Sequence, residues 1–129
     1  MNNKIMVVDD EIDILTSLRV LFEKQKYDVI TVESGEECLR QLEKGFRGII
    51  LMDIMMPNMD GWETIKEIVK RGLIREVAIE IITGKGTKDH EKLWELGSYV
   101  YDYLTKPIDI RELIDSVRKC CVYLDARKD

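Results

Sequence analysis

Short apolar runs alternate along the whole chain with longer segments in which apolar residues recur every three or four positions. The short runs are rich in Val and Ile, as is typical of β-strands, and the longer segments have the periodicity of amphipathic helices. The pattern predicts strands at 4–8, 28–32, 48–52, 77–82 and 100–104. It predicts helices at 12–24, 35–44, 61–71, 88–96 and 110–125.

Capping signals mark the ends of these predicted helices. Three helix starts have an acceptor side chain followed three residues later by Glu, which is the spacing of a capping box: Ser34 with Glu37, Asp60 with Glu63, and Asp109 with Glu112. Three glycines stand where helices should stop: Gly45, Gly72 and Gly97.

Five strands alternating with five helices predict an α/β fold with a parallel sheet covered on both faces. The first, third and fourth runs are almost continuously apolar, as expected of strands buried on both sides. For 129 residues without repeats or linkers, we expect a single domain spanning 1–129. The favoured arrangement is a flavodoxin-like, doubly wound five-stranded sheet of order 2-1-3-4-5, flanked by five helices. Its ligands bind at the carboxyl ends of strands one and three.

Composition narrows the functional classes. The net charge of −5 disfavours non-specific binding to nucleic acid or to an anionic membrane. An odd set of three cysteines without metal-like spacing indicates a reduced, cytoplasmic protein. No signal peptide is recognisable, and no apolar stretch approaches the roughly 18 residues that a membrane span needs.

Polar residues follow four of the predicted strands: Asp9 and Asp10, then Asp53, Thr83 and Lys106. Three carboxylates at one sheet edge would raise each other's pKa values unless a cation neutralised them, and an oxygen-only set suits Mg²⁺. Lysine and threonine on the same rim can bind phosphoryl oxygens. Together these residues indicate phosphoryl chemistry, in which a carboxylate can be the nucleophile.

Four segments at these strand ends resemble the CheY-like receiver domains of two-component response regulators. They are VVDDE at 7–11, LMDIMMPNMDG at 51–61, IITG at 81–84 and YLTKP at 103–107. The resemblance implies that Asp53 accepts a phosphoryl group from a phosphohistidine on a partner. It assigns further roles by position: Asp10, Asp53 and the backbone carbonyl of Met55 as Mg²⁺ ligands, Asp9 as a ligand through water, Lys106 and Thr83 as partners of phosphoryl oxygens, and Pro107 as the residue after a cis peptide bond.

The resemblance also implies a signalling role rather than an enzyme with its own substrate. Thr83 and Tyr103 would form a switch that changes the face made by the fourth helix, fifth strand and fifth helix. Expected partners are a sensor histidine kinase or phosphotransfer protein and a downstream protein target, with a second phosphorylated copy as a further candidate. No direct contact with nucleic acid or membrane is expected within these residues. Met55 and Lys85 occupy positions that influence the lifetime of the phosphoryl group in the family.

Other classes compete with this interpretation. A receiver-like module that binds partners without phosphorylation is the main alternative, although the intact acidic pair, acceptor, Thr and Lys count against it. A dehalogenase-type phosphatase would need a second Asp and a Thr at alternate positions after Asp9, where the chain has Glu11 and Asp13. A flavodoxin is disfavoured because the acids after the first strand would repel a flavin phosphate.

Two features depart from the family pattern. Tyr99, Tyr101 and Tyr103 alternate, so they are expected to share one face of a strand. The tract at 97–106 is long, which indicates either a longer fourth helix that includes Gly97 or an inserted loop. With Trp94 nearby, the aromatic residues could bind a protein partner or pack against the last helix. Glu80 interrupts the apolar fourth strand and is expected to reach solvent or a cation.

Overall fold

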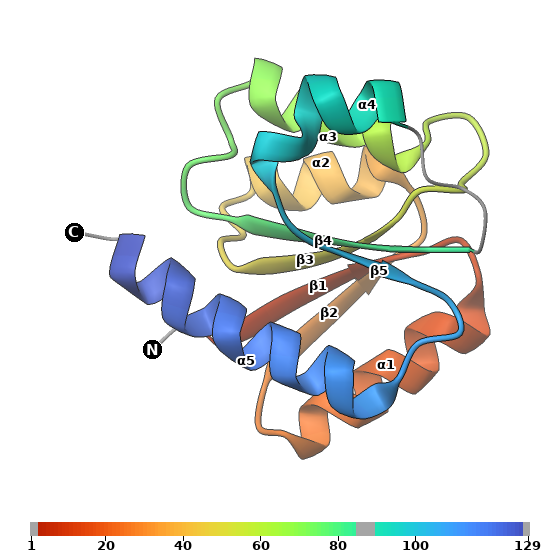
Figure 1. The fold of residues 1–129 in the computed structure, drawn as a ribbon, viewed down its shortest axis with the longest axis vertical. Helices are drawn as coiled ribbons and strands as arrows, with labels where there is room; N and C mark the ends of the chain where they lie inside the picture. The colour runs from red at the N-terminus through yellow and green to blue at the C-terminus, as the bar shows by residue number, and fades with distance from the viewer. Residues whose placement is uncertain (1–2, 85–89, 128–129) are drawn as a thin grey trace.

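The computed structural model describes residues 3–84 and 90–127. It contains a five-stranded parallel sheet of order β2-β1-β3-β4-β5, as predicted. Figure 1 shows the sheet between two layers of helices, with α1 and α5 on one face and α2, α3 and α4 on the other. The carboxyl ends of β1 and β3 therefore lie side by side, at the edge where the sequence predicts the site.

The elements lie close to their predicted positions. The strands are β1 (Lys4–Val8), β2 (Asp28–Val32), β3 (Ile49–Asp53), β4 (Ala78–Thr83) and β5 (Val100–Thr105). The helices are α1 (Ile12–Lys24), α2 (Gly35–Glu43), α3 (Gly61–Lys70), α4 (His90–Leu96), the 3₁₀ turn η1 (Gly97–Tyr99) and α5 (Ile110–Arg127). The first two strands have the predicted bounds, and the predicted start of the fourth helix at 88 lies outside the described residues.

Two apolar clusters hold the layers together, one on each face of the sheet. On β1, Met6 and Val8 pack with α2, α3 and α4, whereas Ile5 and Val7 pack with α1 and α5. Every residue of β3 and β4 is buried. Burial on both faces explains why these strands are almost continuously apolar rather than alternating.

Local capping fixes where the helices begin. The Ser34 hydroxyl accepts a hydrogen bond from the Glu37 N–H at 3.1 Å. Asp60 accepts from the Glu63 N–H at 2.8 Å, and the Asp60 N–H donates to the Glu63 carboxylate at 3.0 Å, which completes the predicted capping box. Asp109 accepts from the N–H groups at the start of α5. Each side chain satisfies N–H groups that the helix itself leaves unpaired.

The region before β5 differs from both sequence interpretations. Helix α4 ends at Leu96, and η1 leads directly into β5 at Val100. Gly97 therefore lies outside α4, and no loop is inserted before the strand. The long tract at 97–106 is instead made of the 3₁₀ turn η1, the strand β5 and an irregularity in the pairing of β5 with β4.

That irregularity is a β-bulge opposite β4. Ile79 pairs with Val100, but the next β4 residue, Glu80, pairs with Asp102, so Tyr101 is an extra residue. Tyr101 packs with the α1 and α5 cluster, whereas Tyr103 packs with the α2, α3 and α4 cluster. The expectation that Tyr99, Tyr101 and Tyr103 share one face is wrong, because Tyr99 belongs to η1 and one extra residue reverses the alternation.

Candidate functional site

The three predicted acids meet at the carboxyl edge of the sheet. Asp9 and Asp10 follow β1, and Asp53 is the last residue of β3, the neighbouring strand. One carboxylate oxygen from each lies within 4.8 Å of the others. Within the described part of the chain, these three form the one such group of potential metal ligands.

Asp9 and Asp53 are buried, while Asp10 is exposed. The Glu11 N–H donates to Asp9 Oδ1 at 2.9 Å, and the Met55 N–H donates to Asp53 Oδ1 at 3.2 Å. Burial, followed by the charge of Asp9, raises the pKa of Asp53 to about 6. Burial also raises the pKa of Asp9. The cluster therefore concentrates negative charge where water cannot screen it, which is the environment that favours binding of a cation.

Thr83 at the end of β4 and Lys106 directly after β5 lie at the same edge of the sheet. The Lys106 ammonium lies 3.7 Å from Asp9 Oδ2, and the Lys106 N–H donates to the Thr83 carbonyl at 2.7 Å. Thr83 is the buried last residue of β4. The Lys106–Pro107 peptide bond is cis, as predicted. Every predicted acid, the threonine and the lysine thus lie at one edge of the sheet.

Gly61, which belongs to one of the sequence motifs, allows α3 to approach the end of β3 closely. Its N–H donates to the Ile54 carbonyl at 2.9 Å. A Cβ added at Gly61 would lie 2.5 Å from the Asp53 carbonyl oxygen and 2.8 Å from Ile54 Cα. These are backbone atoms that cannot rotate away, so the position of Asp53 depends on a residue without a side chain.

Tyr103 lies on the same sheet face as Thr83. It pairs with Ile81 in the β4–β5 ladder, two residues before Thr83. Its ring stacks on the buried indole of Trp62 from α3, with centroids 6.4 Å apart. Trp62 thus packs in the core and connects β5 to the helix that begins beside Asp53.

The oxygen-only donor set fits Mg²⁺, which takes one or two protein carboxylates and keeps several waters. The roles of Asp10, Asp53 and Asp9 as direct or water-mediated ligands remain predictions, as does the carbonyl of Met55. Lys85 lies outside the described residues.

Glu80 corrects one sequence expectation. It reaches neither solvent nor a cationic side chain among the described residues, because it is fully buried between β4 and α5. Its partner is the Ser116 hydroxyl, 36 positions later in the chain. The available signal was Ser116 itself, a polar residue on the otherwise apolar buried face of α5.

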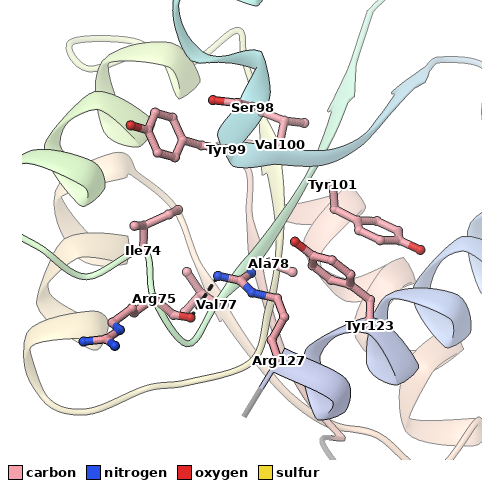
Figure 2. A pocket seen from close by; sticks show the side chains of 10 residues that line it. All are labelled: Ile74, Arg75, Val77, Ala78, Ser98, Tyr99, Val100, Tyr101, Tyr123 and Arg127. Carbon is pink, nitrogen blue, oxygen red and sulfur yellow. Dashed lines mark hydrogen bonds between the residues drawn. The ribbon is translucent and has the colours of Figure 1, made fainter. Parts of the chain in front are cut away.

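A separate pocket of about 280 Å³ lies at the opposite edge of the sheet. Figure 2 shows Tyr101 beside Tyr123 and Arg127 reaching to the Arg75 carbonyl. The tyrosine centroids are 5.0 Å apart, and the Arg127 hydrogen bond is 3.1 Å long. Tyr101 therefore packs against α5, whereas Trp94 on α4 is 92% exposed. None of the predicted site residues lines this pocket.

No helix in the described ranges combines the length and the apolar character needed to cross a bilayer.

Comparison with known proteins agrees with the geometry. The response regulator receiver domain model matches residues 5–118. PhoP of Bacillus subtilis, an alkaline phosphatase synthesis transcriptional regulatory protein, is 39% identical over 113 residues, which cover 88% of this chain and 46% of PhoP. The response regulator SaeR of Staphylococcus aureus is 34% identical over 110 residues, 85% of this chain and 46% of SaeR. The chain thus spans about half the length of these curated relatives.

The fold comparison gives the same result. A CheY-like receiver domain from Methanospirillum hungatei superposes with a TM-score of 0.89 at 36% identity, over 95% of this chain and 97% of the other. The chain belongs to the response regulator receiver domain family.

Proposed function

We propose that this receiver domain accepts a phosphoryl group on Asp53. The convergence of Asp9, Asp10 and Asp53 beside Lys106 is the observation that supports the proposal. Asp53 Oδ1 is occupied by the Met55 N–H, while Oδ2 accepts no hydrogen bond from a described residue. Oδ2 is therefore the nucleophile that forms the new P–O bond. The phosphohistidine P–N bond breaks, and the departing imidazole keeps the electron pair and takes a proton.

Mg²⁺ bound by the acids would neutralise their charge and that of the phosphoryl oxygens. The Lys106 ammonium would leave Asp9 to pair with one phosphoryl oxygen, and the Thr83 hydroxyl would donate to another. Met55→Asn and Lys85→Glu are expected to change the lifetime of the phosphoryl group, since Met55 follows the proposed acceptor by two residues and Lys85 follows Thr83 by two residues in the sequence.

The donor is a sensor histidine kinase or a phosphotransfer protein. Three exposed apolar side chains lie in segments that follow the carboxyl ends of β1, β3 and β5: Ile12 at the start of α1, Met55 after β3, and Ile110 at the start of α5. Such residues can contact a partner that must bring its histidine to a buried carboxylate.

The output is a change in the α4-β5-α5 face. Phosphorylation adds roughly −1.5 to −2 charge and three acceptor oxygens. Drawing Thr83 toward those oxygens would alter the space beside Tyr103, which shares its sheet face. The exposed Trp94 on α4 offers a contact for a downstream protein or for a second phosphorylated copy.

Intact mass spectrometry tests the proposal. The protein is incubated with Mg²⁺ and a small acyl phosphate, whose leaving carboxylate replaces the imidazole. Wild type should gain the mass of one phosphoryl group, and Asp53→Asn should gain none. Asp28→Asn, which changes an exposed aspartate at the other end of the sheet, should behave as wild type. A wild type without added mass would instead favour a partner-binding module that works without phosphorylation.

A further inference from the structure

A second carboxyl cluster lies away from the acidic site, between β4, β5 and α5. Glu80 is fully buried, and its ladder partner is Asp102 on β5. The Ser116 hydroxyl oxygen lies 2.7 Å from Glu80 Oε1 and 2.7 Å from Asp102 Oδ2. One hydroxyl thus bridges two carboxyl groups.

The number of protons in this bridge decides its chemistry. A serine hydroxyl donates one hydrogen bond, so it can serve only one ionised carboxylate. If both acids were ionised, one of the two short contacts would place an acceptor against an acceptor. A second proton on one carboxyl group turns both contacts into hydrogen bonds. Glu80 is the acid that holds this proton, because Glu80 is fully buried, whereas Asp102 is partly exposed and costs less to ionise.

Glu80 Oε2 gives independent evidence for a neutral carboxyl group. This oxygen is buried and has no hydrogen-bond partner of normal geometry, and the Cys120 thiol, which also interacts with the carboxyl group, is only a weak donor. An unpaired oxygen is far less costly on a neutral carboxylic acid than on a carboxylate.

No ionic partner replaces the proton. Among the described residues, no Lys, Arg or His lies within 4.0 Å of the Glu80 carboxyl group. The titratable groups around it are Asp102 and Tyr101 from β5 and Cys120 and Cys121 from α5, with Lys119 acting on Tyr101. On β3, the neighbouring residue is Leu51. Burial raises the pKa of both thiols, which keeps them uncharged.

We propose that Glu80, Ser116 and Asp102 form a proton-sharing cluster that joins β5 to β4 and α5 and loosens when Glu80 ionises. Glu80 donates to Ser116, and Ser116 donates to Asp102. Asp102 Oδ1 in turn accepts from the Tyr103 N–H at 2.8 Å. The cluster therefore ends on the residue that stacks against Trp62, so pH acts on the same strand as the proposed phosphorylation switch. Its effect on signalling rests on that proposed function, but the proton sharing does not.

The sign of the pH effect follows from burial. Burial, with a further contribution from the charge of Asp102, raises the pKa of Glu80 from 4.5 to about 7. The stabilisation is complete below the unfolded value of 4.5 and is lost as the pH rises from there through about 7. The cluster thus changes state close to neutral pH.

Carbon-13 NMR of the Glu side-chain carboxyl groups tests the cluster directly. The titration uses Asp53→Asn, because the pKa of buried Asp53 is also raised, to about 6, and its ionisation could affect the signals near neutral pH. Glu80→Gln in the same background assigns the Glu80 signal. We expect the Glu80 carboxyl to titrate close to pH 7 and the Tyr103 amide signal to follow with the same midpoint. A midpoint near the ordinary value of 4.5 would overturn the proposal.

Two variants test the connection. Ser116→Ala should uncouple the Tyr103 amide from Glu80, because it removes the bridging hydroxyl. In wild type, ionisation of Glu80 should change the unfolding equilibrium constant by up to about tenfold per pH unit between the unfolded-state and folded-state pKa values of this group. Glu80→Gln should remove this pH dependence. A Tyr103 amide that still followed Glu80 without Ser116 would refute the bridge. Because Asp53→Asn cannot be phosphorylated at that position, these results are independent of the phosphoacceptor assignment.

Discussion

Replacing the proposed acceptor Asp53 by Asn should stabilise the domain when Mg²⁺ is absent. Asp53 is buried beside Asp9, and its pKa is raised from 3.8 to about 6. Ionising it in the folded state therefore costs up to about 3 kcal/mol more than in the unfolded chain. Asparagine keeps the size of the side chain and can still accept from the Met55 N–H, but it carries no charge.

The size of this effect depends on pH. A raised folded-state pKa means that the contribution of Asp53 to wild-type stability is most favourable below pH 3.8 and is lost as the pH rises through about 6. The difference in free energy of unfolding between Asp53→Asn and wild type should thus be small in acid and grow to its full value above neutral pH. Urea denaturation with a chelator, repeated across this range, measures it.

Mg²⁺ should offset much of this difference. Binding to the folded state stabilises wild type by about 2.7 kcal/mol when the free ion is at 100 times its dissociation constant. The variant lacks one carboxylate and should gain less. Asp28→Asn serves as a control, because Asp28 is exposed at the opposite end of the sheet. If Asp53→Asn were less stable than wild type above neutral pH in the presence of a chelator, burial and the charge of Asp9 would not make ionised Asp53 costly.

The remaining predictions concern packing, the switch and a helix cap. Gly61→Ala should destabilise the domain by about 1–3 kcal/mol and slow phosphorylation, because the new methyl group meets backbone atoms of Asp53 and Ile54. Urea denaturation and mass spectrometry measure the two effects. Gly97→Ala is the control in both assays, because a methyl group added there meets nothing within 4 Å. Trp94→Phe leaves Trp62 as the one tryptophan, and its fluorescence should change when a phosphoryl mimic binds, because Tyr103 stacks on it. Unchanged emission when the mimic occupies Asp53 would argue against the Tyr103 switch. Asp60→Ala should cost about 1 kcal/mol in urea denaturation by removing the α3 cap, and no loss would show that Glu63 alone suffices.

Much of the fold could be predicted because local signals agree with the tertiary structure. The run at Lys4–Val8 is continuously apolar after its first residue because both faces of β1 are covered, and Asp60 with Glu63 caps α3 through contacts three residues apart. The positions of Asp9, Asp53, Thr83 and Lys106 follow from strand order alone, since the carboxyl ends of parallel strands share one edge.

The parts that could not be predicted depend on long-range contacts or on a change of one residue in register. The bulge at Tyr101 leaves the composition of β5 unchanged, yet it reverses which face Tyr103 occupies. The partner of Glu80 comes from α5, and nothing near Glu80 in sequence indicates it. Gly61 could be seen as part of a motif, but the backbone contact that requires glycine appears only when α3 packs beside β3.

The bulge in β5 also affects how copies of this protein can associate. β5 is an edge strand, so its outer side presents N–H and carbonyl groups to which another chain could add a strand. A bulge twists and interrupts such an edge, which makes continuous strand pairing with a neighbouring molecule unfavourable. Two copies that meet at this side of the molecule would therefore join through the side chains of α4 and α5 and not by extending the sheet. The same irregularity protects the domain against aggregation through its exposed edge.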